Sequence, residues 1–428
     1  MRVVIVAEHA SAKFGGEAFL PLNYFRLLRS RQIETWLVSH QRTQSELELL
    51  FPDAIDHMHF VADTWLHRAL YHSGKYLPRR VAEATTGTLM HLYTEVMQRR
   101  IVRELVQKYQ IDIVHQPIPV SPKQPSLMFD LSAPVVIGPM NGGIEYPPAF
   151  QTRQSAWIVQ FVILGRRAAN LFNRLLPGKL KAQTLLVANS RTQQALPAGL
   201  HGAVIELVEN GVDLTIWRSD LAYSKPLNQP IKFVYVGRLV DWKAIDLLLE
   251  AFHPVATKTG AILELIGDGI LRQDLAAQVV TLGLSDHVVF RGWLSQAACA
   301  RQVQQADVFV LPSLLECGGA VILEAMAMEL PVVVTNWGGP VDYVDASCGI
   351  LVNPTSQDIF VTELTTAMLK LAESPDLRLQ MGQAGKQRVL AHFDWERKVD
   401  RLLEIYEQTI AAWSTKPPGI SPPGWNKV

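Results

Sequence analysis

Two cations follow an apolar run in the second half of the chain. Residues 233–237 (FVYVG) end in a glycine, Arg238 comes next, and Lys243 follows after four more residues. In open α/β sheets, ligands bind at the carboxyl ends of the parallel strands. At such a place an arginine can hold phosphate oxygens through two parallel hydrogen bonds, and a lysine adds a point charge. The pattern indicates either a diphosphate site or two solvated surface cations.

Two carboxylates flank a glycine-containing loop further along the chain. Glu316, Cys317, Gly318 and Gly319 follow another apolar run, and Glu324 lies in the helical pattern that comes next. Backbone N–H groups at a helix start can bind hydroxyl or anionic acceptors, so a carboxylate beside them suits a polyhydroxylated ligand such as a sugar. One alternative is a solvated helix residue at position 324, and another is a paired-acid glycosidase. The glycosidase interpretation leaves the two cations unexplained.

A third candidate lies near the start of the chain. Gly15-Gly16 follow the apolar run 3–7 and precede a helical pattern. Such glycines allow either a close approach to phosphate or simply a tight turn. Other phosphate and metal motifs fail. Gly267 and Gly269 open a G-x-G-x-x-G pattern, but Arg272 stands at its last position, and His57 and His59 have no third ligand in view. We expect no metal and no cofactor.

Composition excludes several classes of protein. The 428 residues include 40 Lys and Arg against 40 Asp and Glu, which argues against a general nucleic-acid binder. Three cysteines are too few for a disulfide framework, so we interpret them as reduced thiols of a cytoplasmic protein. The apolar start stops at Glu8-His9 without a cleavage pattern, and no run approaches the ~20 apolar residues of a membrane span.

Short β-branched runs alternate with helical patterns along the whole chain, which is typical of parallel α/β sheets. We expect a first domain over residues 1–195 and a second over 196–392, the run 204–208 being the second domain's first strand. Residues 393–413 carry a helix-period apolar stripe, and the Pro-rich and Gly-rich residues 414–428 suggest a disordered tail.

Read together, these motifs resemble glycosyltransferase family 4, whose members have the two-domain GT-B fold. The resemblance covers nearly the whole chain, and its parts stand in the family's order. They are Gly15-Gly16, 187–190, 209–213, 236–239 with Lys243, 266–269, 290–292, 306–308, 311–313, 316–327, and 331–335 with Gly338-Gly339. The resemblance implies two Rossmann-like domains with a deep cleft between them. The helix from Trp395 would cross back to the first domain.

The resemblance also implies an activity, namely retaining transfer of a sugar from a nucleotide-sugar donor. We favour a UDP-sugar over a GDP-sugar, and a glycan, lipid-linked or small-molecule acceptor in polysaccharide or glycoconjugate biosynthesis. A sugar-nucleotide epimerase and a non-catalytic sugar-nucleotide-binding protein are the alternatives.

The resemblance assigns roles to individual residues of this chain. The candidate catalytic residues are Arg238 and Lys243 on the diphosphate and Glu316 on the donor sugar. The remaining donor-binding candidates are Gly15 and Gly16 over the diphosphate, Cys317, Gly318 and Gly319 at the sugar, Glu324 at the ribose, and Gly292 and Leu294 at the nucleobase.

Two departures from the family pattern concern the sugar and the acceptor. The family usually has Glu-Gly-Phe-Gly where this chain has Glu316 to Gly319, so the sugar pocket is expected to differ in shape. Many members carry a histidine after a first-domain strand, where this chain has Asn141, Gly142 and Gly143. We interpret Asn141 as a polar contact to the acceptor, or the glycines as the shape of an acceptor loop.

Residues 151–181 contain six Lys and Arg, no Asp or Glu, and several large apolar side chains. This composition fits a helix at an anionic membrane surface, and it equally fits a helix packed on the first domain with solvated cations. The first interpretation predicts a peripheral protein on the cytoplasmic face of the membrane.

Overall fold

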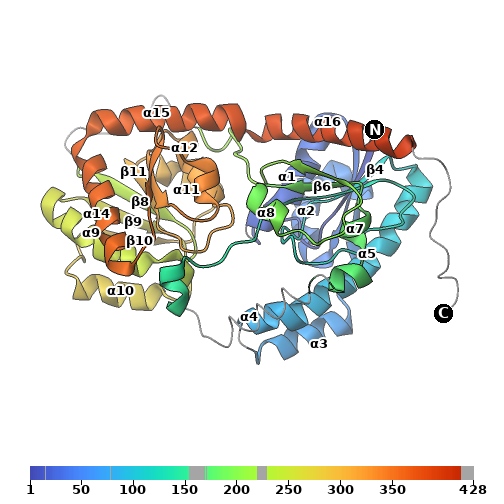
Figure 1. Ribbon diagram of the computed structural model, residues 1–428, viewed down its shortest axis with the longest axis horizontal. Coiled ribbons are helices and arrows are strands. Elements are labelled where there is room, and N and C mark those ends of the chain that lie inside the picture. The colour runs from blue at the N-terminus through green and yellow to red at the C-terminus, as the bar shows by residue number, and fades with distance from the viewer. Residues whose placement is uncertain (15, 78, 154–168, 170, 219–228, 416–428) are drawn as a thin grey trace.

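The computed structural model of the chain describes residues 1–14, 16–77, 79–153, 169, 171–218 and 229–415. It contains two parallel sheets, which lie side by side and are flanked by helices (Figure 1). The apolar runs form their strands because strands buried on both faces need apolar side chains throughout.

The first sheet has seven strands in the order β3-β2-β1-β4-β5-β6-β7. Its central strand β1 pairs Val4 with Trp36 of β2 and with Val114 of β4. The strands are β1 Arg2–Val6, β2 Glu34–His40, β3 Met58–Val61, β4 Ile113–Gln116, β5 Val135–Met140, β6 Thr184–Val187 and β7 Ala203–Glu206. The helices around it are α1 Gly16–Ser30, α2 Gln44–Leu50, α3 Trp65–Gly74, α4 Arg79–Ala82, α5 Thr88–Tyr109, α7 Gly178–Lys181 and α8 Ser190–Gln194, with short turns η1 Gln41–Thr43, η2 Pro52–His57, η3 Glu83–Gly87 and η4 Pro148–Arg153.

The second sheet has six strands in the order β10-β9-β8-β11-β12-β13. The strands are β8 Lys232–Val236, β9 Ile262–Ile266, β10 Val288–Gly292, β11 Val308–Leu311, β12 Val332–Thr335 and β13 Gly349–Val352. Its helices are α9 Ile245–Thr259, α10 Arg272–Thr281, α11 Gln296–Val303, α12 Ala320–Ala327, α13 Pro340–Tyr343, α14 Gln357–Glu373 and α15 Pro375–His392, with the turn η5 Asp241–Lys243. The strand order reverses between β8 and β11, and such a point opens a crevice at the carboxyl ends of the strands.

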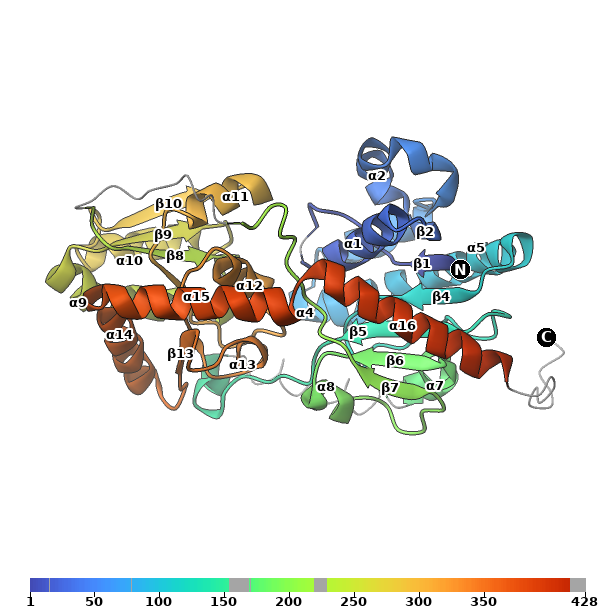
Figure 2. The same cartoon turned by 90° about the horizontal axis from the view of Figure 1, so that it is seen from above.

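The last helix, α16 Trp395–Ser414, joins the two halves. Its apolar face, which includes Val399, Leu402 and Tyr406, lies in the core of the first domain. Thr409 of α16 and Thr184 of β6 share a hydrogen bond of 2.8 Å between their hydroxyls. Figure 2 shows α15 and α16 running across both domains nearly end to end. Of the expected tail, Ser414 ends α16, and residues 416–428 lie outside the described residues.

Two features correct the expected division of the chain. Strand β7 pairs in parallel with β6, so the run assigned to the second domain belongs to the first sheet, and the boundary expected near residue 195 precedes that sheet's last strand. Tyr146 and Phe150, from the expected first domain, are buried in the core of the second. The cause is physical: an edge strand and a loop anchored by two aromatic side chains carry no local signal of which sheet they join.

None of the described helices combines the length and the apolar character that a bilayer crossing requires.

Candidate active site between the two sheets

Three loops at the carboxyl edge of the second sheet are tied together by backbone hydrogen bonds. The Gly237 N–H donates to the Ile266 carbonyl at 2.9 Å, and the Gly267 N–H donates to the Gly292 carbonyl at 2.8 Å. A side chain at Gly267 would overlap the Gly237 carbonyl, so only glycine fits there. These contacts place Arg238 and Gly292 on one edge of the sheet.

The structure brings two of the three predicted catalytic residues into direct contact. Lys243, in the turn after β8, is buried, and its ammonium forms an ion pair with the Glu316 carboxylate. Arg238 is exposed, and its guanidinium lies 5.4 Å from the ring centroid of Trp242. Since β8 and β11 flank the reversal of strand order, the arginine and the ion pair lie at the crevice that this reversal creates.

The loop after β11 has a conformation that depends on its glycines. Gly319 has a φ of +87° and caps α12. A side chain at Gly318 would overlap the Glu209 carboxylate and the Asn210 amide. Cys317 is exposed, yet partial desolvation of its thiol and the nearby Glu316 and Glu209 carboxylates raise the pKa of the thiol to about 11. Cys317 is therefore a protonated thiol near neutral pH, which is a poor nucleophile.

Glu324 lies in α12, one turn beyond this loop, and is partly buried. Removal from water raises the pKa of its carboxyl from 4.5 to about 8, and no described residue contributes an opposing hydrogen bond or charge. At neutral pH the carboxyl is therefore mostly protonated, so it can both donate to and accept from a bound hydroxyl.

This raised pKa predicts a pH-dependent effect of Glu324→Gln. The folded state favours the protonated carboxyl, so the wild type loses stability as the pH rises from 4.5 towards 8. Glutamine does not ionise, and we expect Glu324→Gln to match the wild type at pH 5 and to exceed it by about 1–3 kcal/mol at pH 8. Urea unfolding at the two pH values measures this difference, and an equal difference at both would refute the raised pKa.

Asn141 links the two domains directly above this loop. It is buried after β5, and its Nδ2 donates to the Glu209 Oε1 at 2.6 Å and to the Cys317 carbonyl at 2.7 Å. Both of its N–H groups are therefore used within the protein. The neighbouring Gly142 leaves no room for a side chain against Pro122, and Gly143 has a φ of +75°. The geometry favours the interpretation in which the glycines shape the acceptor loop.

A cavity of about 620 Å³ opens beside Asn141, between the first domain and the loop after β11. Its lining includes Glu17, Lys123, Asn141, Gly143, Arg191 and Cys317. Gly16 is the first residue of α1 and precedes Glu17, which lines this cavity. Gly15 lies outside the described residues. Glu17 accepts a hydrogen bond from the Val120 N–H at 3.0 Å, and loss of hydration raises the pKa of its carboxyl.

Three residues at the site were missed by the sequence analysis. Glu17 follows the glycine pair, where a carboxylate at a helix start would have been a signal. Trp293 lies between the two predicted nucleobase residues, Gly292 and the partly buried Leu294, and 69% of its surface is exposed. Glu209 stands inside the motif 209–213, but nothing in its sequence context indicates its contacts.

Glu209 is the centre of a buried polar network. Its Oε1 accepts from Asn141, from the Asn210 Nδ2 at 2.9 Å and from the Tyr343 hydroxyl at 3.0 Å. The ammonium of Lys398, in α16, donates to the Glu209 backbone carbonyl. Desolvation raises the pKa of Glu209 and lowers that of Lys398 to about 7. The network thus joins both domains and the last helix.

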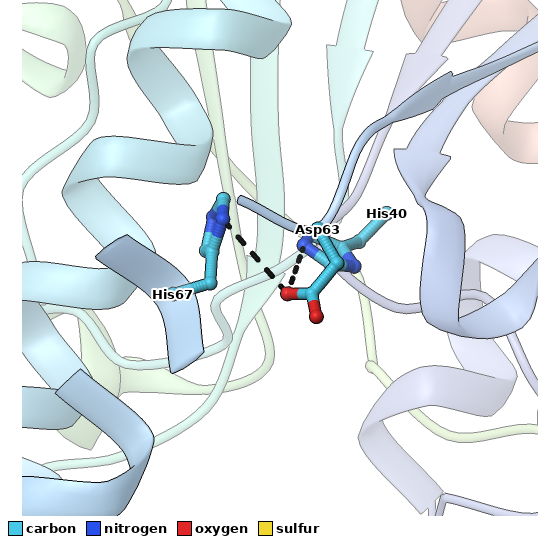
Figure 3. A group of neighbouring side chains, drawn as sticks. All are labelled: His40, Asp63 and His67. Carbon is cyan, nitrogen blue, oxygen red and sulfur yellow. Dashed lines mark ion pairs between the residues drawn. The ribbon is translucent and has the colours of Figure 1, made fainter. Parts of the chain in front are cut away.

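A separate cluster of possible metal ligands, His40, Asp63 and His67, lies in the first domain (Figure 3). The Asp63 Oδ1 is 4.0 Å from the His40 Nε2 and from the His67 Nδ1. Each Nδ1 accepts from a backbone N–H, that of Arg42 for His40 and that of Thr64 for His67. The proton of each neutral ring is therefore on Nε2, so His40 turns an N–H rather than a lone pair towards Asp63. In this arrangement His40 presents a donor to Asp63, and His67 uses its Nδ1 lone pair for the Thr64 N–H, so the described geometry does not match metal ligation.

Residues 151–181 are only partly covered by the structure, because 154–168 and 170 lie outside the described residues. At the start of this segment, Arg153 forms two hydrogen bonds with the Asp246 carboxylate of the second domain. At its end, Lys179 is buried and donates to the Ser121 carbonyl at 2.6 Å. Not all of its cations are therefore solvated, and the membrane contact expected of this segment stays a prediction.

The second half of the chain is similar in sequence to a known protein family. Residues 221–388 match the family model described as glycosyl transferases group 1. A curated relative, the alpha-maltose-1-phosphate synthase of Mycolicibacterium smegmatis, is 30% identical over 225 residues, which cover 48% of this chain and 57% of that protein. The chain spans about half the length of the curated relatives it matches.

Solved structures match over nearly the whole chain. The sucrose-phosphate synthase of Thermosynechococcus elongatus has a TM-score of 0.68 at 18% identity and covers 96% of this chain and 99% of its own. HepE of Anabaena, solved with UDP, has a TM-score of 0.65 at 15% identity and covers 95% of this chain and 100% of its own. At these identities the likeness establishes the fold, two Rossmann-like domains in the GT-B arrangement. Residues 221–388 therefore belong to the glycosyl transferases group 1 family, and the chain as a whole shares the GT-B fold of the solved glycosyltransferases.

Proposed function

We propose that the protein transfers a sugar, with retention of anomeric configuration, from a nucleotide-sugar donor to an acceptor held on the first domain. The observation that carries this proposal is the buried ion pair of Lys243 with Glu316, beside Arg238 at the reversal of strand order. A diphosphate needs cations, and a sugar needs carboxylate and backbone donors. This crevice supplies both within one pair of loops.

The donor takes a defined course over the carboxyl edge of the second sheet. Its diphosphate lies against Arg238 and Lys243, with Gly16 at the start of α1 on the side of the first domain. Its sugar lies on Glu316 and on the backbone of residues 317–319, and its ribose hydroxyls bind Glu324. The base rests at Gly292 and Leu294, where the exposed ring of Trp293 offers a surface for stacking.

The reaction follows from the charge that develops on the leaving group. As the glycosidic bond breaks, the nucleoside diphosphate gains negative charge, and Arg238 and Lys243 stabilise it in place. The lysine ammonium has three donors, so it can bind a phosphate oxygen while still holding Glu316. Cys317 is protonated and Glu316 is ion-paired, so neither is an activated nucleophile. We therefore favour attack by the acceptor on the face that the diphosphate leaves, with the phosphate taking the proton.

The cavity beside Asn141 favours a transferase over an epimerase, because an epimerase needs no acceptor site. Its polar lining suits a hydroxyl-bearing acceptor, either a glycan or a lipid-linked sugar. For the donor we favour a UDP-sugar over a GDP-sugar, and the UDP-bound HepE structure shares this fold. Release of nucleotide with an isomerised free sugar, in the absence of acceptor, would instead identify an epimerase.

A thermal-shift panel of nucleotide sugars tests the donor. We expect one donor to raise the melting temperature in a saturable manner, corresponding to about 2.7 kcal/mol at a concentration of 100 times Kd. The same base as a mononucleotide should produce a smaller shift, because it lacks the second phosphate and the sugar. No shift with any UDP- or GDP-sugar would contradict the proposed function.

A further inference from the structure

Helix α3 leaves one of its faces without a protein partner. Its inner face contacts η3 and α5, and His67 is its one buried residue among those described. Its outer face carries Trp65, Arg68, Ala69, His72 and, just beyond the helix, Tyr76. Residues at these spacings share one side of a helix, and all five are exposed. In Figure 1, α3 and α4 project from the first domain on the side opposite α16.

The large side chains on this face are aromatic and open to solvent. Trp65 is 74% exposed, Tyr71 58% and Tyr76 90%. Leu77 and Leu89, from the adjoining turn and from the start of α5, add two exposed aliphatic side chains. Tryptophan and tyrosine have an apolar ring and a polar tip, a combination favoured at the boundary between water and lipid. A cluster of this kind on one projecting element marks an interaction surface.

The charge of the same element is of one sign. Residues 64–82 contain four Lys and Arg and no Asp or Glu, and with Asp63 and Glu83, which flank this stretch, residues 63–83 still have an excess of two positive charges. Arg68 and Lys75 are exposed on α3 and at its C-terminal cap, and no described carboxylate pairs with them. The Lys75 ammonium lies 4.9 Å from the ring centroid of Tyr71, so cation and aromatic group occupy one surface.

We propose that the outer face of α3, together with Lys75 at its C-terminal cap, docks the protein on an anionic lipid surface. The aromatic rings enter the headgroup layer, and the two cations contact lipid phosphates. An acidic protein partner could pair with the two cations, but it would not explain why exposed aromatic side chains surround them. An anionic lipid surface accounts for both the cations and the aromatic rings.

The position of α3 gives this docking a consequence for the reaction. The helix begins four residues after β3 ends, at the carboxyl edge of the first sheet. The cavity beside Asn141 opens at the same edge, because Asn141 follows β5 and Glu17 follows β1. Docking through α3 therefore brings the acceptor side of the protein towards the bilayer. This last step rests on the proposed function, whereas the docking itself does not.

Vesicle co-sedimentation of the full chain tests the docking without any assay of activity. We expect binding to phosphatidylcholine vesicles that contain phosphatidylglycerol, weaker binding as salt rises, and little binding to pure phosphatidylcholine. The charge variant Arg68→Glu/Lys75→Glu should reduce the partition coefficient about thirtyfold or more, on the basis of ~fivefold per cation. The apolar variant Trp65→Ser/Tyr76→Ser should also release the protein, including at low salt.

Matched controls come from the second domain. Arg301→Glu/Lys370→Glu makes the same change of net charge at two exposed cations in the last turns of α11 and α14. Val280→Ser/Leu379→Ser removes two exposed apolar side chains. Both controls should bind like the wild type. Equal binding by the α3 variants would overturn the proposal. So would loss of binding only in Phe172→Ser/Leu175→Ser, which alters exposed residues of 151–181. Self-association through α3 without vesicle binding would also overturn it.

Discussion

The double variant Arg238→Ala/Lys243→Ala is expected to lose about ten-thousandfold or more in kcat/KM for sugar transfer. Removing one preorganised donor to a developing negative charge typically costs about 100-fold to 1000-fold, and this variant removes both charged side chains of the proposed diphosphate site. Lys243→Ala also leaves the Glu316 carboxylate without its ion-pair partner at the donor sugar. Release of nucleoside diphosphate, measured with the donor identified by thermal shift, gives the rate constants.

The control for this variant keeps its change of net charge but moves it away from the site. Lys258→Ala/Lys370→Ala alters two exposed cations in the last turns of α9 and α14 and should retain kcat/KM within about twofold. Circular dichroism and melting temperature establish that both double variants are folded. If a folded Arg238→Ala/Lys243→Ala variant kept near-normal kcat/KM, the assignment of the diphosphate site would be refuted.

Much of the second sheet was predictable from the sequence. The short, mainly apolar sequences of β8, β11 and β12 are visible in the chain, because strands buried on both faces need apolar side chains along most of their length. The same runs locate the loops that follow them, and so the edge on which Arg238 and Glu316 lie. Local pattern therefore positions those candidate residues whose place depends on the strand immediately before them.

Contacts between distant parts of the chain were not predictable in this way. The apolar run 204–208 predicts a strand, but only its pairing with β6 assigns the strand to the first sheet. Nothing in the sequence around Asn141 indicates that its side chain has partners. In the structure, its two N–H groups donate to the Glu209 carboxylate and to the Cys317 carbonyl. A single sequence carries no record of such pairings, because they arise from the packing of one domain against the other.

The Glu209 network leads to the second large effect that we expect. Glu209→Ala removes an acceptor from two buried donors, Asn141 and Tyr343. The partly buried Asn210 also loses a hydrogen bond, but its Nδ2 keeps the Tyr343 hydroxyl as an acceptor at 2.9 Å. Each unsatisfied buried donor costs about 1–3 kcal/mol, so the variant should lose about 3–5 kcal/mol of unfolding free energy in urea. Glu206→Ala, an exposed residue at the end of β7, should change it by less than about 0.5 kcal/mol.

Glu209→Gln separates the hydrogen bonds from the charge. Glutamine keeps an Oε1 acceptor for the three donors but removes the carboxylate, whose attraction holds up the pKa of Lys398 against desolvation. If the hydrogen bonds dominate, Glu209→Gln should retain more than half of the stability that Glu209→Ala loses. If the charge dominated, both variants would be equally unstable. Loss of the carboxylate would then lower the pKa of Lys398 below its wild-type value of about 7, so the stability of Glu209→Gln would already rise with pH below pH 7. Unfolding at pH 6 and pH 8 distinguishes these outcomes, and wild-type stability of Glu209→Ala at both would show that the network does not join the domains.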